Sequence, residues 1–127
     1  MAKVLIVDDE HLTVEMLSVF LNMMGHESIG AYSGRQMWDK LAYEQPETIL
    51  LDIMLPDANG LDLCRALRQQ TQTQHTAIIM ISAYSPPLTQ EAEAAGANGY
   101  LTKPINLEKL SAALKPGEHP LFNPKVG

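Results

Sequence analysis

The stretch "TILLDIMLPDANGLDLCRALR", Thr48–Arg68, predicts a strand, a loop and a helix in succession. Its first part, Thr48–Leu51, shows no alternation of polar and apolar side chains, which is typical of a parallel strand covered on both faces. The loop "DIMLPDANG" contains proline, asparagine and glycine, residues that favour turns. Leu61–Arg68 then repeats its apolar residues at helical spacing. The stretch therefore predicts one β-then-α unit of a parallel sheet.

The same pattern recurs along the chain. Strands are expected at Val4–Val7, Ser28–Ala31, Thr48–Leu51, Ala77–Ile81 and Tyr100–Thr102, and helices at His11–Met24, Ser33–Tyr43, Leu61–Arg68, between Pro87 and Gly96, and from Asn106 to Pro116. Five such units favour a sheet with helices on both faces, and right-handed crossovers leave few strand orders. We therefore expect an α/β fold, a flavodoxin-like doubly wound five-stranded parallel sheet of order 2-1-3-4-5 with five helices.

Length and composition fit a single acidic domain. The 127 residues are enough to bury one core, and we assign residues 1–115 to the domain and residues 116–127 to a C-terminal tail or the start of a linker. Nine Lys and Arg residues against fifteen Asp and Glu residues give a net charge of −6. We expect no direct binding of nucleic acid, because its phosphates require a basic surface.

The apolar runs and the single cysteine indicate a cytoplasmic location. Runs such as Ala77–Ile81 are far shorter than the ~20 residues of a membrane-spanning helix, so we expect no membrane partner. Cys64 has no second cysteine with which to form a disulfide. A chain without internal disulfides fits a reducing compartment such as the cytoplasm.

Charged residues stand where three of the expected strands end. Asp8 and Asp9 follow the first strand, Asp52 follows the third and Lys103 follows the fifth. Parallel strands end at one edge of the sheet, so these side chains are expected to meet there. Two carboxylates about 5 Å apart repel by about 3 kcal/mol at an effective dielectric constant of about 20. A hard cation removes this repulsion, and Mg2+ suits a site with few protein carboxylates.

Ser82 and Lys103 add a second requirement to this edge. A metal site alone needs neither residue, but both are explained if Asp52 attacks phosphorus and forms an acyl phosphate. Lys103 and the metal would then neutralise the charge of the transferred group. Ser82, which follows the fourth expected strand, would donate a hydrogen bond to one of its oxygens. The chemistry indicated is therefore phosphoryl transfer to Asp52.

Four motifs together resemble one known family. The segments "VDD", "LLDIMLPDANG", "MISA" and "GYLTKP" occur in this order and at these spacings in the sequence. They resemble the receiver domain of two-component response regulators, over nearly the whole chain from Lys3 to about Lys115. Each motif alone has low specificity, whereas the ordered set is highly specific.

The resemblance implies an acceptor and a metal site. Asp52 would accept the phosphoryl group. Asp9 would bind Mg2+ directly and Asp8 mainly through water, with Asp52 and the backbone carbonyl of Met54 as further ligands.

The resemblance also implies a switch. Ser82 would sense the phosphoryl group, Lys103 would pair with it, and Tyr100 would turn inward when Ser82 is drawn to the phosphate. The Lys103–Pro104 peptide would be cis, an arrangement that costs little before proline. Gly60 would help to shape the loop that places Met54.

The expected function is a phosphorylation-dependent signalling switch rather than an enzyme, because turnover occurs once and on the chain itself. The partners implied are a sensor histidine kinase or histidine phosphotransfer protein as donor, and an output domain or target protein downstream. The resemblance leaves a phosphorylation-linked homodimer open, although the charged pairs typical of transcription-factor dimers of this family are not evident. The alternative is a phosphorylation-independent interaction module with the same fold.

Two enzyme-like alternatives fit the residues less well. A haloacid-dehalogenase-type phosphatase also uses an aspartate nucleophile and Mg2+, but it needs an acid two residues later, where this chain has Met54. A flavodoxin-like flavin carrier would need a loop rich in hydroxyl groups and glycine after the first strand, where this chain has "DDEH".

Two further acids are given structural roles. Asp57 is interpreted as a turn residue, because it lies in the proline-, asparagine- and glycine-containing loop. Glu10 is interpreted as a partner of the first helix dipole rather than as a metal ligand.

Overall fold

A computed structural model of the protein describes residues 2–115. The elements are β1 (Lys3–Val7), α1 (His11–Met23), β2 (Glu27–Ala31), α2 (Gly34–Leu41), β3 (Thr48–Asp52), α3 (Gly60–Arg68), β4 (Ala77–Ser82), α4 (Thr89–Ala95), β5 (Gly99–Thr102) and α5 (Leu107–Ala113). All strand pairs are parallel, in the order β2-β1-β3-β4-β5. The predicted fold class and strand order are therefore confirmed.

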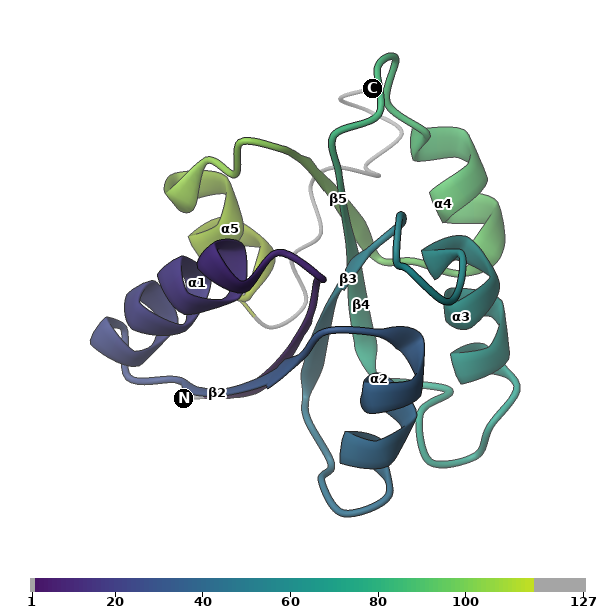
Figure 1. Cartoon of the computed structure of the whole chain (residues 1–127), viewed down its shortest axis with the longest axis horizontal. Helices are drawn as coiled ribbons and strands as arrows, with labels where there is room; N and C mark the ends of the chain where they lie inside the picture. The colour runs from purple at the N-terminus through teal and green to yellow at the C-terminus, as the bar shows by residue number, and fades with distance from the viewer. Residues whose placement is uncertain (1, 116–127) are drawn as a thin grey trace.

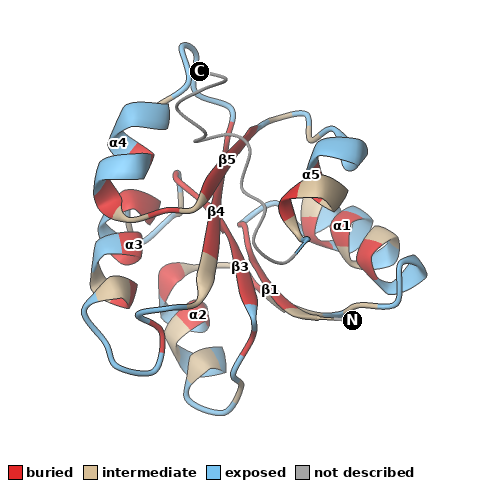
Figure 2. Cartoon of the chain, turned by 180° about the vertical axis from the view of Figure 1, so that it is seen from behind, coloured by how far each residue is buried: buried red, intermediate tan, exposed pale blue. Residues whose placement is uncertain are grey.

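The sheet lies between two helical layers, with α1 and α5 on one face and α2, α3 and α4 on the other (Figure 1). Successive residues of a strand point to opposite faces. Leu5 and Val7 of β1 accordingly pack with the α2–α4 layer, whereas Val4 and Ile6 pack with α1 and α5. Figure 2 shows the strands as mostly buried, which explains why the central strands show no polar alternation.

Most helix boundaries agree with the expected ones within two or three residues. Ser33 Oγ accepts a hydrogen bond from the Gln36 amide at the start of α2. The Gln36 side chain, however, accepts from the amide of Tyr32 rather than from that of Ser33, so the reciprocal bond of a capping box is displaced by one residue. Asn106 caps α5, where its side chain accepts a hydrogen bond from the Lys109 amide. Gly96 follows α4 with φ +101°, a left-handed conformation that favours glycine.

The last helix is shorter than expected from the sequence. Helix α5 ends at Ala113, before the expected stop at Pro116. The tail or linker expected over residues 116–127 lies outside the described residues. Within residues 2–115, no helix is both long and apolar enough to cross a membrane.

Candidate functional site

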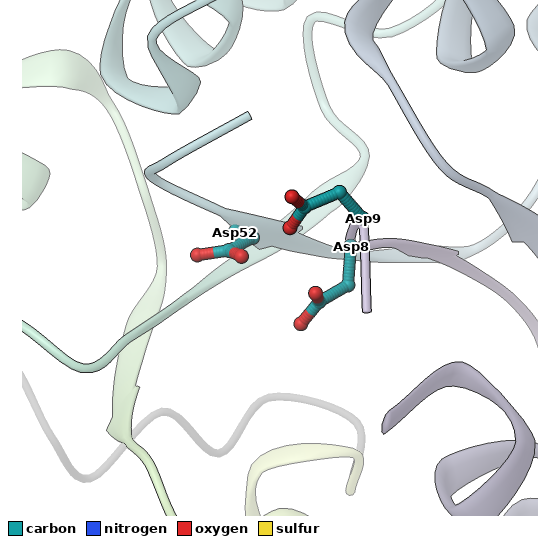
Figure 3. A group of neighbouring side chains, drawn as sticks. All are labelled: Asp8, Asp9 and Asp52. Carbon is teal, nitrogen blue, oxygen red and sulfur yellow. The ribbon is translucent and has the colours of Figure 1, made fainter. Parts of the chain in front are cut away.

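The register of the sheet brings the acidic residues together. Val7 of β1 pairs with Leu51 of β3, so Asp8, directly after β1, and Asp52, the last residue of β3, lie side by side. Figure 3 shows the carboxylates of Asp8, Asp9 and Asp52 gathered at the ends of these two strands. One oxygen from each of the three lies within 4.8 Å of the others. The convergence expected from the strand ends is therefore present.

These carboxylates differ in exposure. Asp8 is fully buried and Asp52 is 4% exposed, whereas Asp9 is exposed. Asp8 Oδ1 accepts a hydrogen bond from the Glu10 amide at 2.9 Å, and Asp52 Oδ1 accepts one from the Met54 amide at 3.3 Å. Burial of charged groups costs free energy unless they are paired, so the site concentrates unfavourable negative charge below its surface.

Lys103 supplies the positive charge of the site. Its Nζ lies 2.7 Å from Asp8 Oδ2, 3.2 Å from Asp52 Oδ2 and 3.2 Å from Glu10 Oε1. It donates hydrogen bonds to Asp52 and Glu10. Its approach to Asp8 lacks hydrogen-bond geometry, so that Asp8 Oδ2 is a buried oxygen without a hydrogen bond. One ammonium therefore contacts three carboxylates, and Asp9 adds a fourth carboxylate to the cleft that Lys103 lines.

The pKa values reflect this imbalance. Burial, followed by the negative charge of Asp8, raises the pKa of Asp52 to about 6, although Lys103 acts in the opposite direction. Burial by itself would lower the pKa of Lys103, but close contact with Asp8 and Asp52 and their negative charges raise it above its ordinary value. The arrangement holds Lys103 charged and leaves Asp52 mainly ionised at pH 7.

The residues present fit a hard divalent cation. Carboxylate oxygens are the ligands that Mg2+ prefers, and three of them lie within reach of one ion. The buried Asp8 Oδ2 has the Lys103 ammonium beside it but no hydrogen bond, so a further cation or its bound water would reduce the repulsion among the acids. Asp8, Asp9 and Asp52 are thus the side chains that could hold Mg2+.

A cleft of about 440 Å3 opens over the acids. It is lined by Asp9, Glu10, Asp52, Met54, Leu55, Pro56, Ala83 and Lys103. Met54 is 63% exposed and stands at the rim of the loop that follows β3. A ligand in this cleft would contact Asp52 and Lys103 together.

Gly60 controls how closely this loop returns to β3. Its amide donates a hydrogen bond of 2.7 Å to the carbonyl of Ile53. An added Cβ would collide with the carbonyl oxygen of Asp52 and would lie 2.8 Å from Ile53 Cα. The start of α3 can therefore pack against the end of β3 only when this residue lacks a side chain.

Ser82 and Tyr100 lie deeper than the acids. Ser82 is 1% exposed at the end of β4, and its Oγ accepts a hydrogen bond from the Tyr84 amide at 3.0 Å. Tyr100 is 2% exposed and packs with the α2–α4 layer rather than lining the cleft. Its hydroxyl accepts a hydrogen bond from the amide of Leu88, just before α4. The aromatic ring therefore already points inward and is tied to the β4–α4 loop.

Two acids have contacts that differ from their sequence interpretation. Glu10 stands at the start of α1, but its side chain makes no capping hydrogen bond there and instead accepts one from Lys103. Asp57 is more than a turn residue, because its carboxylate accepts hydrogen bonds from the first two amides of α2. The proximity of Glu10 to Asp8 and Asp9 in the sequence was a usable signal, whereas nothing local indicated the partners of Asp57.

The cis peptide expected beside the site is present. Lys103–Pro104 is cis, and Ser85–Pro86 in the β4–α4 loop, for which no such expectation was made, is cis as well.

The chain is similar to proteins of known class. A family model described as "Response regulator receiver domain" matches residues 4–115. The phosphate regulon transcriptional regulatory protein PhoB of Pseudomonas aeruginosa is 37% identical over 113 residues, which cover 88% of this chain and 49% of PhoB. The transcriptional regulatory protein KdpE of Staphylococcus aureus is 36% identical over 115 residues, 90% of this chain and 48% of KdpE. The chain thus spans about half the length of these curated relatives.

Solved structures of response regulators have the same fold. The chemotaxis response regulator CheY4 of Vibrio cholerae superposes with a TM-score of 0.82 at 35% identity, covering 90% of this chain and 99% of CheY4. A two-component response regulator from Clostridium difficile superposes with a TM-score of 0.83 at 29% identity, covering 91% and 93% of the two chains.

Proposed function

Because this chain belongs to the response regulator receiver domain family of two-component signalling, we propose that it is a switch operated by phosphorylation of Asp52. The donor is a histidine kinase or a histidine phosphotransfer protein. The observation that carries the proposal is the contact of Asp52 with Lys103 in a cleft whose other acids could hold Mg2+. A protein with this activity modifies itself once per signal and is not an enzyme acting on a separate substrate.

The proposed transfer uses Asp52 as the nucleophile. A carboxylate oxygen of Asp52 forms a bond to phosphorus as the phosphorus–nitrogen bond of the donor phosphohistidine breaks. The electron pair of that bond stays on the imidazole nitrogen. The Lys103 ammonium, 3.2 Å from Asp52 Oδ2, neutralises charge on the transferring oxygens. Mg2+ held by Asp8, Asp9, Asp52 and the carbonyl of Met54 would supply further positive charge there.

The signal would pass from Ser82 to Tyr100. Ser82 Oγ accepts a hydrogen bond from the Tyr84 amide. We propose that the phosphoryl group draws the Ser82 hydroxyl away from this amide. The β4–α4 loop would then rearrange around the Tyr100 hydroxyl, which holds the Leu88 amide. A pocket of about 320 Å3 beside Tyr100, formed by the β4–α4 loop, β5 and the start of α5, would change shape in response. The phosphoryl group would act by shifting an existing equilibrium between two conformations of the β4–α4 loop.

The direct test is the intact mass of the chain after incubation with a small phosphodonor, with and without MgCl2. A gain of one phosphoryl group that requires Mg2+ is expected. No gain with any donor, including a phosphorylated donor protein, would favour the phosphorylation-independent module instead.

The aspartyl phosphate is expected to hydrolyse slowly, and Met54→Asn is expected to speed its loss. Met54 lines the same cleft as Asp52, where its side chain would hinder the approach of water to a phosphoryl group on Asp52, whereas an amide can hold a water by hydrogen bonds. We expect hydrolysis to accelerate about threefold to tenfold, which corresponds to about 0.7–1.4 kcal/mol in the barrier. The measurement is the decay of the phosphorylated mass after the donor is removed. An unchanged decay rate would refute the role given to Met54.

The donor protein needs a docking surface beside the cleft, and we infer that this surface is the exposed apolar face of α1. The exposed apolar side chains of this helix are Leu12, Met16, Val19 and Met23, which are 80%, 48%, 60% and 81% exposed. Their spacing places them on one face, and a groove of about 580 Å3 runs between this face and β2. Because α1 begins directly after the acids, we propose that a helix of the donor packs along this face.

Met16→Lys is expected to slow transfer from a donor protein about tenfold relative to transfer from a small phosphodonor. A charge in an apolar helix contact costs more than the ~1.4 kcal/mol that a tenfold effect requires. The measurement compares the two transfer rates for the same preparation, using a phosphotransfer domain that modifies the unaltered chain. Tyr43→Lys is the control, because Tyr43 is 90% exposed after the end of α2. Equal effects of the two substitutions would contradict docking on α1.

A further inference from the structure

The start of α2 is held by a residue from another part of the chain. The amides of Gly34 and Arg35 donate to Asp57 Oδ1 at 2.8 Å and to Asp57 Oδ2 at 2.9 Å. The next amide, that of Gln36, donates to Ser33 Oγ at 3.1 Å. Helix α2 thus has two caps, a local one from Ser33 and a distant one from Asp57. The first two amides of a helix normally depend on water or side chains, and here both oxygens of one carboxylate serve them.

Asp57 lies in the segment of residues 53–59 that connects β3 to α3, which we name the acceptor loop. This loop is closed on itself by two hydrogen bonds, from the Leu55 amide to the Ala58 carbonyl and from the Gly60 amide to the Ile53 carbonyl, which together make the antiparallel bridge between Met54 and Asn59. Among the hydrogen bonds of residues 2–115, three others tie the loop to elements beyond β3 and α3. One is from the Ile53 amide to β4, at the base of the loop, and the other two are those that Asp57 accepts from α2.

The acceptor loop forms one wall of the cleft over Asp52. Met54, Leu55 and Pro56 line the cleft, and Asp57 is the next residue along the chain. Near the tip of the acceptor loop, the hydrogen bonds of the Asp57 carboxylate therefore fix the position of this wall of the cleft. Ala58 also contributes packing, because an added Cβ on Gly34 would lie 3.2 Å from Ala58 Cβ.

We propose that Asp57 is a positioning residue for the phosphoryl-acceptor site, and that it acts by fastening the acceptor loop to the first turn of α2. The inference rests on the proposed function, since it concerns the wall that would present the Met54 carbonyl to Mg2+. The two backbone amides lower the pKa of Asp57, in agreement with an ionised carboxylate at this anchor. Asp57 itself does not line the cleft, so its effect passes through the loop.

Three variants separate positioning from capping and from charge. Asp57→Ala removes both hydrogen bonds, Asp57→Asn removes the charge but keeps one acceptor oxygen, and Ser33→Ala removes the local cap of α2 without touching the acceptor loop. Two quantities are measured for each: Mg2+ affinity, from amide chemical shifts as MgCl2 is added, and metal-free amide hydrogen exchange at residues 53–60.

Asp57→Ala is expected to weaken Mg2+ binding about tenfold, the low end for residues that orient metal ligands indirectly, and to speed exchange in the acceptor loop. Asp57→Asn is expected to fall between Asp57→Ala and the unaltered chain. Ser33→Ala is expected to lower the melting temperature with no change in Mg2+ affinity or loop exchange. Unchanged loop exchange in Asp57→Ala would overturn the inference. Equal Mg2+ affinities of the two Asp57 variants would assign the effect to charge and also overturn it.

The same experiments distinguish the inference from the proposed function. If the unaltered chain binds no Mg2+, the proposed function fails, while the metal-free exchange measurement still decides whether Asp57 fastens the loop. If the unaltered chain binds Mg2+ and accepts a phosphoryl group but Asp57→Ala behaves identically in both measurements, only the positioning role fails.

Discussion

Asp52→Asn is expected to abolish phosphoryl uptake completely while making the metal-free protein more stable. The amide is not a nucleophile that can form an acyl phosphate, so the mass gain should disappear with every donor. The gain in stability has a separate cause. Asp52 is 4% exposed beside Asp8, and the substitution removes a buried charge that these surroundings disfavour.

The pKa of Asp52 gives the sign and the pH window of the stability effect. Its value of about 6, against an ordinary 3.8, means that the folded state binds this proton more tightly than the unfolded state does. The unaltered protein therefore loses stability as the pH rises from about 4 to about 6, and the loss persists above pH 6. A tenfold difference in proton affinity between the two states corresponds to about 1.4 kcal/mol. Because the amide also loses the charge contact with Lys103, we expect a net gain of about 1–3 kcal/mol at pH 8.

The measurement is urea denaturation at pH 4 and pH 8 in the presence of a chelator, together with intact mass after phosphodonor treatment. The control is Asp39→Asn, which removes an exposed carboxylate from α2. Asp39→Asn should take up a phosphoryl group normally and show no pH-dependent gain. A phosphorylated Asp52→Asn protein would show that another residue is the acceptor. If the stability difference between Asp52→Asn and the unaltered protein does not grow from pH 4 to pH 8, the Asp52 charge does not destabilise the folded state.

The acids of the site could be predicted because their position depends on strand ends alone. Once the β-then-α units were recognised, the end of each parallel strand was fixed to one edge of the sheet. The register then placed Asp8 next to Asp52 through the pair Val7 and Leu51. The lack of polar–apolar alternation in Thr48–Leu51 similarly predicted a core on both faces of the sheet, and Leu50 and Leu51 do pack in opposite layers.

The contacts that escaped prediction join side chains to partners that no local pattern identifies. Asp57 meets the amides of Gly34 and Arg35 across separations of 23 and 22 residues. In the sequence it stands between proline and glycine, where a turn interpretation is sufficient. Glu10 likewise fits a helix start by composition, but its carboxylate lies 3.2 Å from the Lys103 ammonium, which attracts it. Only the packing of α2 against the acceptor loop, and of the β5–α5 loop against the acids, decides these contacts.

Gly60→Ala is expected to destabilise the protein by about 3 kcal/mol or more, the upper part of the range for overpacking a tight contact. The added Cβ would meet the Asp52 carbonyl oxygen and, at 2.8 Å, Ile53 Cα. Both are backbone atoms of the strand end, so no side-chain rotation relieves the collision. The first turn of α3 must then separate from β3 and weaken the 2.7 Å bond from the Gly60 amide to the Ile53 carbonyl. Since domains of this size are stable by only about 5–15 kcal/mol, the loss is a large share.

Gly25→Ala is the matched control, because the two glycines are required for different reasons. Gly25 has φ +88° and open space around its Cα, so alanine there meets a conformational penalty of about 1–2 kcal/mol and no collision. Gly60 lies in the first turn of α3 without a positive φ, where helix propensity alone would make alanine stabilising by about 0.5–1 kcal/mol. Urea denaturation should therefore show a larger loss of stability for Gly60→Ala than for Gly25→Ala, although helix propensity alone would make Gly60→Ala stabilising. Phosphoryl uptake should fall in Gly60→Ala alone, because its collision displaces the backbone of Asp52. If Gly60→Ala loses less stability than Gly25→Ala, α3 can shift away from β3 at little cost in free energy.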